Sequence, residues 1–276
     1  MLKIIAIILM TLDHIGCYFQ VYMPSEVYWV LRAVGRLAFP IFCYYLACGY
    51  QRTHNLSKYF FRLSFFALLS EPVLYYSFNL AGFSYDSRNI FFTLVCALIF
   101  LGGLDIFLQN IDVVKRNSTH YKGIIFGLVT MICACMIGRY FMVDYGIYGV
   151  MLPGVFYFAQ RFSLRGLDMN YTQLLYKIQT DGLRLQTGRQ LIKRTRNFAL
   201  VGMYILTALF MLLDYFLHNV FPFPSIQILA ILSIFICYIP GLQKSTANKP
   251  SVVQQYFFYI YYPLHIFILG FIVSRL

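Results

Sequence analysis

The 276-residue chain has few charged residues: Asp, Glu, Lys and Arg together make up 12% of it, and only ten residues are acidic. Soluble domains carry about 25% charged residues. The chain also lacks a Cys-x-x-Cys pair and any ladder of histidines at metal-ligand spacing. All seven cysteines lie in apolar stretches, so we expect buried small side chains, without a disulfide framework and without a metal site.

Apolar residues dominate instead, at 60% of the chain with a mean hydropathy of +0.68. Most of the apolar segments have the roughly 20 residues that a helix needs to cross a bilayer. In lipid the backbone must satisfy its own hydrogen bonds, which favours helices. The sequence therefore predicts an all-α polytopic transmembrane bundle with a single domain over 1–276. About nine spans are expected, at 3–22, 28–50, 59–79, 89–108, 122–141, 144–160, 197–217, 224–241 and 254–274.

The first segment resembles a short signal peptide, because it follows Met1 and carries Lys3. However, it contains Asp13 and His14, has no clear small-x-small cleavage site and leads into further spans. We expect it to be retained as the first helix.

The basic residues indicate orientation. The net charge is +12, which alone would fit a nucleic-acid partner. However, most Lys and Arg residues fall in alternate connectors, as the positive-inside rule describes. We therefore expect membrane lipids as partners, no nucleic acid, and a cytoplasmic N-terminus.

The connector 161–196 is unusually long and holds eight basic and two acidic residues. It is predicted to be cytoplasmic, and "YTQLLYKIQ" within it is a candidate for a short interfacial helix. Two interpretations stay open: a solvated loop against anionic lipid, or a site for an anionic cofactor.

Ionisable and amide side chains recur inside the apolar segments, where they are expensive and often functional. At about 1.5 Å per helical residue, His14 lies roughly 12 Å below the predicted outer surface. Side chains from six segments share this depth, which predicts a polar cavity in the outer half of the bilayer. They are Asp13, His14, Arg32, Arg36, Glu71, Asn89, Thr93, Asp144 and His265.

Spacing suggests partners within this layer. Arg32 and Arg36 are four apart and share a helix face, so they need a carboxylate from Asp13, Glu71 or Asp144. Asp13 and His14 point about 100° apart on a helix. The partner of His14 therefore need not be Asp13, and a carboxylate from another helix, Glu71 or Asp144, is an alternative.

His14 is the strongest candidate for chemistry, because imidazole exchanges protons near neutral pH. Plainer roles stay open for the others. Glu71 and Arg32 fit halves of structural ion pairs, Asn89 fits a helix cap, and His265, after Pro263, fits helix packing.

The order of motifs resembles the TraX family, which is associated with N-terminal acetylation of F-type pilin. The matching stretches cover nearly the whole chain outside 161–196. They are "LKIIAIILMTLDHIG", "GRLAFPIFCYYLACGY", "KYFFRLSFFALLSEP", "NIFFTL", "DYGIYGV" and "YFFYIYYPLH". The family is thought to be related to polytopic membrane acyltransferases that use cytoplasmic acyl-CoA and an intramembrane histidine. The chain departs from the expected pattern at Cys48, where an acidic residue is expected.

The resemblance implies an acetyltransferase in a bacterial cell membrane that takes its acetyl group from acetyl-CoA. The acceptor would be an amine or hydroxyl on an externally exposed peptide, glycan or lipid. Implied catalytic residues are His14, Asp13, Arg36, Glu71, Asn89 and His265. Implied substrate-binding or acetyl-CoA-binding residues are Arg32, Thr93, Asp144 and Tyr145.

Two other functions fit the same residues. Intramembrane acids, histidines and arginines also build proton-coupled transporters, although the halves of this chain show no repeat. A non-catalytic assembly factor is the third possibility, and it would tolerate the loss of His14.

Overall fold

The computed structural model describes residues 1–114, 121–182, 185–217, 223–239, 242–243 and 251–276. Within these ranges the ordered elements are helices, and the only strand-like feature is an isolated bridge between Arg88 and Val143. The prediction of an all-α fold is confirmed for the part of the chain described.

The chain order begins with two helices that form a tight pair, and most later helices are longer. The elements are α1 (Leu2–Tyr18), α2 (Ser25–Gly35), α3 (Ala38–Arg52), α4 (Leu56–Leu80), α5 (Ile90–Val114), α6 (Tyr121–Tyr140), α7 (Gly146–Ser163), α8 (Tyr171–Asp181), α9 (Leu185–Leu217), the 3₁₀ helix η2 (Ser225–Leu232), α10 (Ser233–Cys237) and α12 (Val252–Val273).

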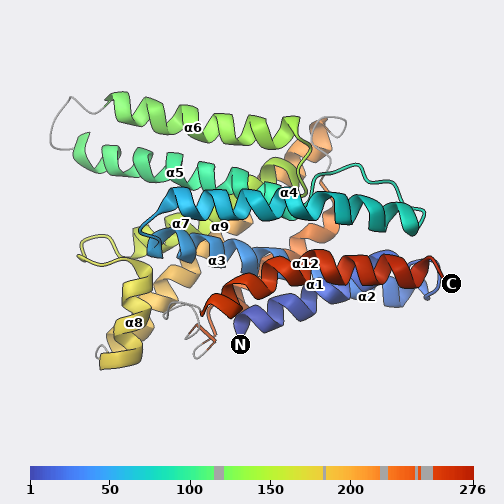
Figure 1. The fold of residues 1–276 in the computed structure, drawn as a ribbon. Helices are drawn as coiled ribbons and strands as arrows, with labels where there is room; N and C mark the ends of the chain where they lie inside the picture. The colour runs from blue at the N-terminus through green and yellow to red at the C-terminus, as the bar shows by residue number, and fades with distance from the viewer. Residues whose placement is uncertain (115–120, 183–184, 218–222, 240–241, 244–250) are drawn as a thin grey trace.

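The long helices form a bundle (Figure 1). α5 and α6 lie against each other along one side, and α1 packs with α2, α3 and α12 on the other. α4 packs between α5 and α12, while α7 packs against α3, α5 and α9. The short helix α8 lies at one end of the bundle (Figure 1). We call this the basic end, since Lys3, Arg52, Lys58 and Lys177 of α8 lie there.

The molecule is an integral membrane protein by length and composition of its helices. Five stretches of the described chain are long and apolar enough to span a bilayer: 25–52, 90–111, 121–140, 186–217 and 256–273. The other predicted segments fall on α1, α4, α7 and the η2–α10 pair. The count of nine spans and the cytoplasmic N-terminus stay predictions.

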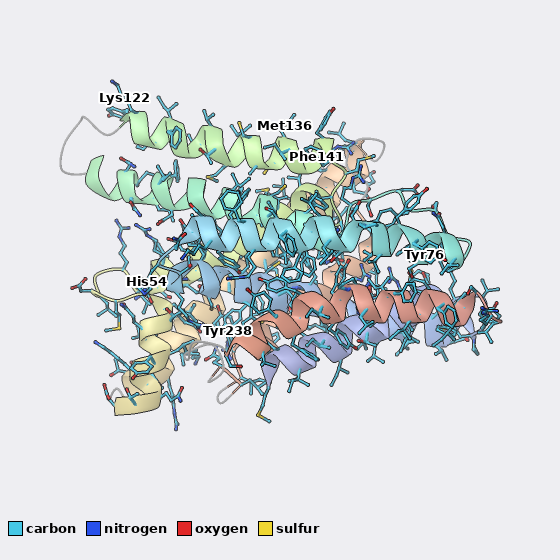
Figure 2. All side chains as sticks on the ribbon, viewed as in Figure 1. His54, Tyr76, Lys122, Met136, Phe141 and Tyr238 are labelled. Atoms are coloured by element: carbon cyan, nitrogen blue, oxygen red, sulfur yellow. The ribbon has the colours of Figure 1, made fainter. Side chains whose placement is uncertain are left out.

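Apolar side chains cover the outside of the bundle. On α6, Ile125, Phe126, Ile132 and Met136 are each between 59% and 60% exposed. Figure 2 shows side chains projecting outward along this helix, including Met136. Water would penalise so large an apolar face, whereas lipid would not.

The predicted connector 161–196 is largely helical. α7 continues to Ser163, and α9 begins at Leu185, well before the predicted span at 197. "YTQLLYKIQ" forms most of α8, as expected from the sequence. A capping box starts α8. The Asn170 side chain accepts a hydrogen bond from the Gln173 backbone amide, and the Gln173 side chain accepts one from the Asn170 backbone amide.

Candidate active site

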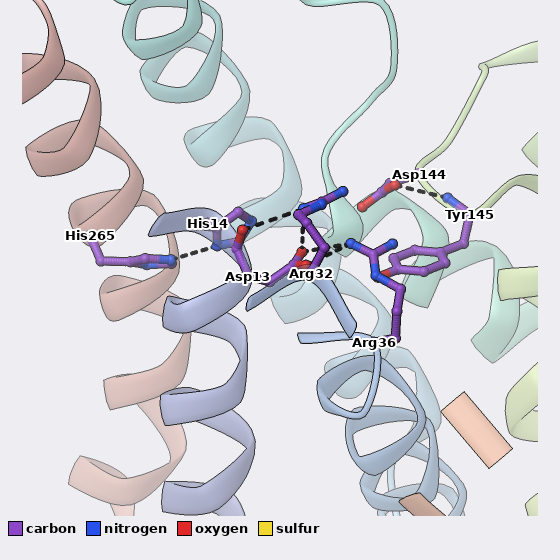
Figure 3. Close-up of polar contacts among 7 residues, drawn as sticks. All are labelled: Asp13, His14, Arg32, Arg36, Asp144, Tyr145 and His265. Carbon is purple, nitrogen blue, oxygen red and sulfur yellow. Dashed lines mark hydrogen bonds and ion pairs between the residues drawn. The ribbon is translucent and has the colours of Figure 1, made fainter. Parts of the chain in front are cut away.

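Asp13 and His14 of α1 point toward different helices, as their angular separation predicts. Asp13 faces Arg32 and Arg36 from α2 and the turn after it, and His14 faces His265 of α12 (Figure 3). Through these two neighbouring residues, α1 therefore contacts both α2 and α12.

The Asp13 carboxylate forms ion pairs with both arginines. Its carboxylate accepts from Arg36 Nη2 at 2.8 and 2.7 Å, and Arg32 Nη1 lies 2.9 Å from Oδ2. Asp13 and Arg36 are both 8% exposed, so this ion pair is buried. Buried charges persist when they are paired and hydrogen-bonded, as these are. We call Asp13, Arg32, Arg36, Asp144 and Tyr145 the arginine cluster.

A helix break places Arg36. α2 ends at Gly35 and α3 starts at Ala38, although the sequence predicts one continuous span over 28–50. Pro40 lies in the first turn of α3 and cannot donate a backbone hydrogen bond to the preceding turn. A Cβ on Gly35 would overlap the Asp13 side chain, so only glycine leaves the carboxylate room beside the arginines.

The turn before α7 closes the other side of the arginine cluster. Tyr145 has a left-handed backbone (φ +59), and its amide donates to Asp144 Oδ1 at 2.9 Å. Its ring stacks on Phe39 with centroids 4.1 Å apart, and the Arg36 guanidinium carbon lies 5.6 Å from the ring centroid. Thr93 of α5 donates to the Asp144 carbonyl at 2.7 Å, which fixes the turn.

The two histidines form the second part of the site. His14 Nδ1 lies 2.9 Å from His265 Nε2, and His265 Nδ1 lies 2.8 Å from the Tyr261 carbonyl. The His265 ring also stacks on the Tyr261 ring. His14 is half-buried and His265 is buried.

These contacts determine the tautomers of the neutral rings. A carbonyl only accepts, so His265 Nδ1 carries the proton and His265 Nε2 is an acceptor. His14 must then donate from Nδ1, which leaves the lone pair of His14 Nε2 available as a base. The His265 imidazole thus fixes the orientation of the His14 ring, as an orienting group does for a catalytic histidine.

Glu71 belongs to a separate set of contacts. Its carboxylate accepts from Arg88 at 2.8 Å, Tyr85 at 3.0 Å and the Asn89 side chain at 2.6 Å. Asn89 also accepts from the Phe91 amide at 3.0 Å, which makes it the cap of α5. Hydrogen bonding to Glu71 raises the pKa of the exposed Arg88, and burial raises the pKa of Tyr85. The structural ion pair and the cap are thus both present.

The residues predicted to share one layer meet in neighbouring sets of contacts, with partners that differ from those expected. Asn89, the cap of α5, and Thr93, four residues further on, connect the Glu71 contacts to the arginine cluster. The sequence suggested Glu71 or Asp144 as the partner of His14, and this was wrong. His265 takes that position, because α12 packs on the face of α1 that His14 occupies.

The large cavity shown by the structure lies on the basic side of the histidines. It measures about 1450 Å³, and its walls come from α1, α3, α4, α5, α8 and α12 and the loops beside them. The predicted cavity faced the outer half of the bilayer instead. Ile7, Phe42 and Phe258 are among the apolar residues that line the cavity that is present.

Sequence reasoning missed two structural features of the site. The Tyr261 carbonyl lies one helical turn before His265, a spacing that pairs side chains with the preceding turn. Gly35 directly precedes Arg36, and small residues often mark close helix approaches in membranes.

Comparison with known proteins follows the same motifs. A family model described as "TraX protein" matches residues 1–176. The chain is 39% identical over 109 residues to the "Probable fimbrial assembly protein FimC, serogroup H1" of Dichelobacter nodosus; this covers 36% of the chain and 43% of that protein. No solved structure matches. Asp13, His14, Arg32, Arg36, Asp144 and Tyr145 all lie inside the family match, whereas His265 lies beyond it.

Proposed function

Because the chain belongs to the TraX family, a family linked to pilin acetylation, we propose that it is a membrane-embedded acetyltransferase. It moves an acetyl group from acetyl-CoA to an amine or hydroxyl of an outward-facing substrate. The observation that carries this proposal is a pair of consecutive hydrogen bonds, from His14 to His265 and from His265 to the Tyr261 carbonyl. They leave His14 Nε2 as a base.

The transfer needs one base and one leaving group. His14 Nε2 takes the proton of the acceptor amine or hydroxyl as the acceptor atom attacks the thioester carbon. The tetrahedral intermediate collapses, the carbon–sulfur bond breaks, and the CoA thiolate takes the proton from His14. His265 orients the His14 ring throughout and stabilises the imidazolium that forms.

Arg36 is better suited than Asn89 to stabilise the oxyanion of the tetrahedral intermediate. Its Nε is buried and has no hydrogen-bond partner among the described residues, so one N–H is available for a developing negative charge. Asn89 Nδ2 already donates to the Ala67 carbonyl and to Glu71. Asp13 keeps Arg36 in place, while Arg32, Thr93, Asp144 and Tyr145 support that arrangement.

The proposed setting is a bacterial cell membrane. The name of the Dichelobacter nodosus relative concerns fimbrial assembly, and a fimbrial subunit would offer an exposed peptide amine. A pilin-like peptide is therefore the first acceptor to test, ahead of a surface glycan or lipid.

The direct test uses the His14→Ala variant, purified in detergent with labelled acetyl-CoA and peptide amines. Loss of general-base catalysis should lower transfer by about 10²- to 10⁴-fold, with unchanged expression and melting. His218→Ala, in a predicted connector outside the described residues, is the matched control and should keep wild-type activity. Full transfer by His14→Ala would rule out the mechanism, and substrate uptake without acetyl-CoA would favour a transporter.

A further inference from the structure

The cavity at the basic end is lined by cations from several helices. Lys3 of α1, Arg52 of α3, Lys58 and Arg62 of α4 and Lys177 of α8 line it. The carboxylate among the lining residues is Asp168. Five positive charges therefore face one negative charge, and such a cavity concentrates anions.

The cavity wall has charged and apolar parts. Lys58 and Lys177 are exposed and mark its mouth, and the other three cations are half-buried, whereas Phe42, Leu94 and Phe258 supply apolar wall. Phe42 and Phe258 approach each other with ring centroids 4.4 Å apart. Phe91 packs edge-on against Phe258 and Tyr262, and Tyr262 lies beside His14. A continuous row of aromatic rings thus leads from the cavity to the base.

The dimensions also indicate the kind of ligand. The volume of about 1450 Å³ exceeds the roughly 300–1,000 Å³ of pockets for drug-sized ligands. Lys3 precedes His14 by eleven residues on one helix, which is about 16 Å at helical rise. The ligand that fits both ends has anionic groups at the mouth and a long, flexible, largely uncharged arm.

Hydrogen bonds fix the position of α8 beside the mouth of the cavity. Asn170 Nδ2 and the Tyr171 amide donate to Gln51 of α3, and the buried Tyr171 hydroxyl accepts from Gln243. These contacts hold Lys177 and Asp168 near the ends of α3 and α4. The long basic connector therefore supplies one wall of the cavity.

We propose that this cavity binds the CoA portion of the acyl donor, with its phosphates held by the five cations. Its arm lies along Phe42 and Phe258, where the row of aromatic rings toward His14 begins. The inference rests on the proposed function, since a CoA thioester is the donor in it. An anionic phospholipid shares the phosphate chemistry and is the competing occupant.

The test measures binding separately from transfer. CoA is titrated by calorimetry into the protein in nanodiscs of zwitterionic lipid. Removal of two phosphate contacts in Lys58→Gln/Lys177→Gln should weaken CoA binding about tenfold. The charge-matched control Lys122→Gln/Lys193→Gln, on α6 and α9, should bind like the wild type. His14→Ala should also bind CoA normally, because the base lies beyond the cavity.

Equal CoA affinity in the double variant and the wild type would overturn the inference. So would wild-type protein that binds phosphatidylglycerol through these lysines but does not bind CoA. CoA binding without acetyl transfer would leave the cavity site in place and contradict the proposed function instead.

Discussion

At the scale of single residues, the site depends on which lone pair each imidazole presents. The fixed acceptor at the Tyr261 carbonyl sets the His265 tautomer, and His265 then sets the His14 tautomer. A backbone carbonyl does this without adding a charge to an apolar region, where charge is expensive. The nearby Asp13 carboxylate is instead committed to the two arginines.

Replacement of His265 separates its orienting role from simple packing. His265→Leu removes the acceptor for His14 and should lower kcat on the order of 10²-fold without changing KM for acetyl-CoA. His265→Gln keeps an acceptor oxygen at a similar reach and should retain part of kcat. Steady-state kinetics on the purified variants gives both values.

The control for this experiment is Thr11→Val. It removes the 2.8 Å contact between Thr11 and the Tyr261 hydroxyl, also at the α1–α12 interface, and should cost about 1 kcal/mol of stability without lowering kcat. If His265→Leu and Thr11→Val behaved alike, His265 would be a packing residue only.

At the scale of helices, glycines allow close approaches between two helix backbones. Among the described helices, α5 and α6 meet where Gly103 and Gly127 face each other. A Cβ on Gly127 would come within 2.7 Å of the Gly103 carbonyl, and the reverse distance is 2.8 Å. Small residues permit such approaches between membrane helices. Between α1 and α2, Gly35 leaves room for the Asp13 side chain.

Gly127→Ala should destabilise the α5–α6 pair by about 1–3 kcal/mol, the usual cost of overpacking. The midpoint of thermal unfolding in detergent should fall, while acetyl transfer per folded molecule stays constant. Gly102→Ala is the matched control, because a Cβ there meets nothing within 4 Å. It should be neutral or slightly stabilising, since alanine favours helix over glycine. Equal melting of both variants would contradict the packing argument.

At the scale of the whole molecule, the two ends of the bundle differ in chemistry. The basic end carries the cavity, and neither the histidines nor the arginine cluster line it. Figure 2 shows His54 toward the basic end and Tyr76 toward the opposite end. This polarity fits a donor entering from one side of the membrane and an acceptor from the other.

The predicted orientation can be tested with Ser57→Cys and Ser87→Cys, made separately after the native cysteines are replaced by alanine. Both positions are exposed. Ser57 lies in the first turn of the 25-residue α4, which is about 38 Å long, and Ser87 lies beyond its C-terminal end. In intact cells a membrane-impermeant maleimide should label Ser87→Cys only, and Ser57→Cys should react after permeabilisation. Labelling of Ser57→Cys in intact cells would reverse the orientation.

The sequence by itself determined that the chain is helical and membrane-embedded, because long apolar runs with few charges leave the backbone no other way to bond in lipid. It also identified the polar residues that come together, since helical rise converts position into depth. Tertiary structure decided their partners. Packing between helices distant in sequence, such as α1 with α12, decides which helix faces His14 and where a cavity opens. It also decides that Gly35 lies where the Asp13 side chain needs room. A periodic pattern in one helix shows which face is polar but not which neighbour covers it.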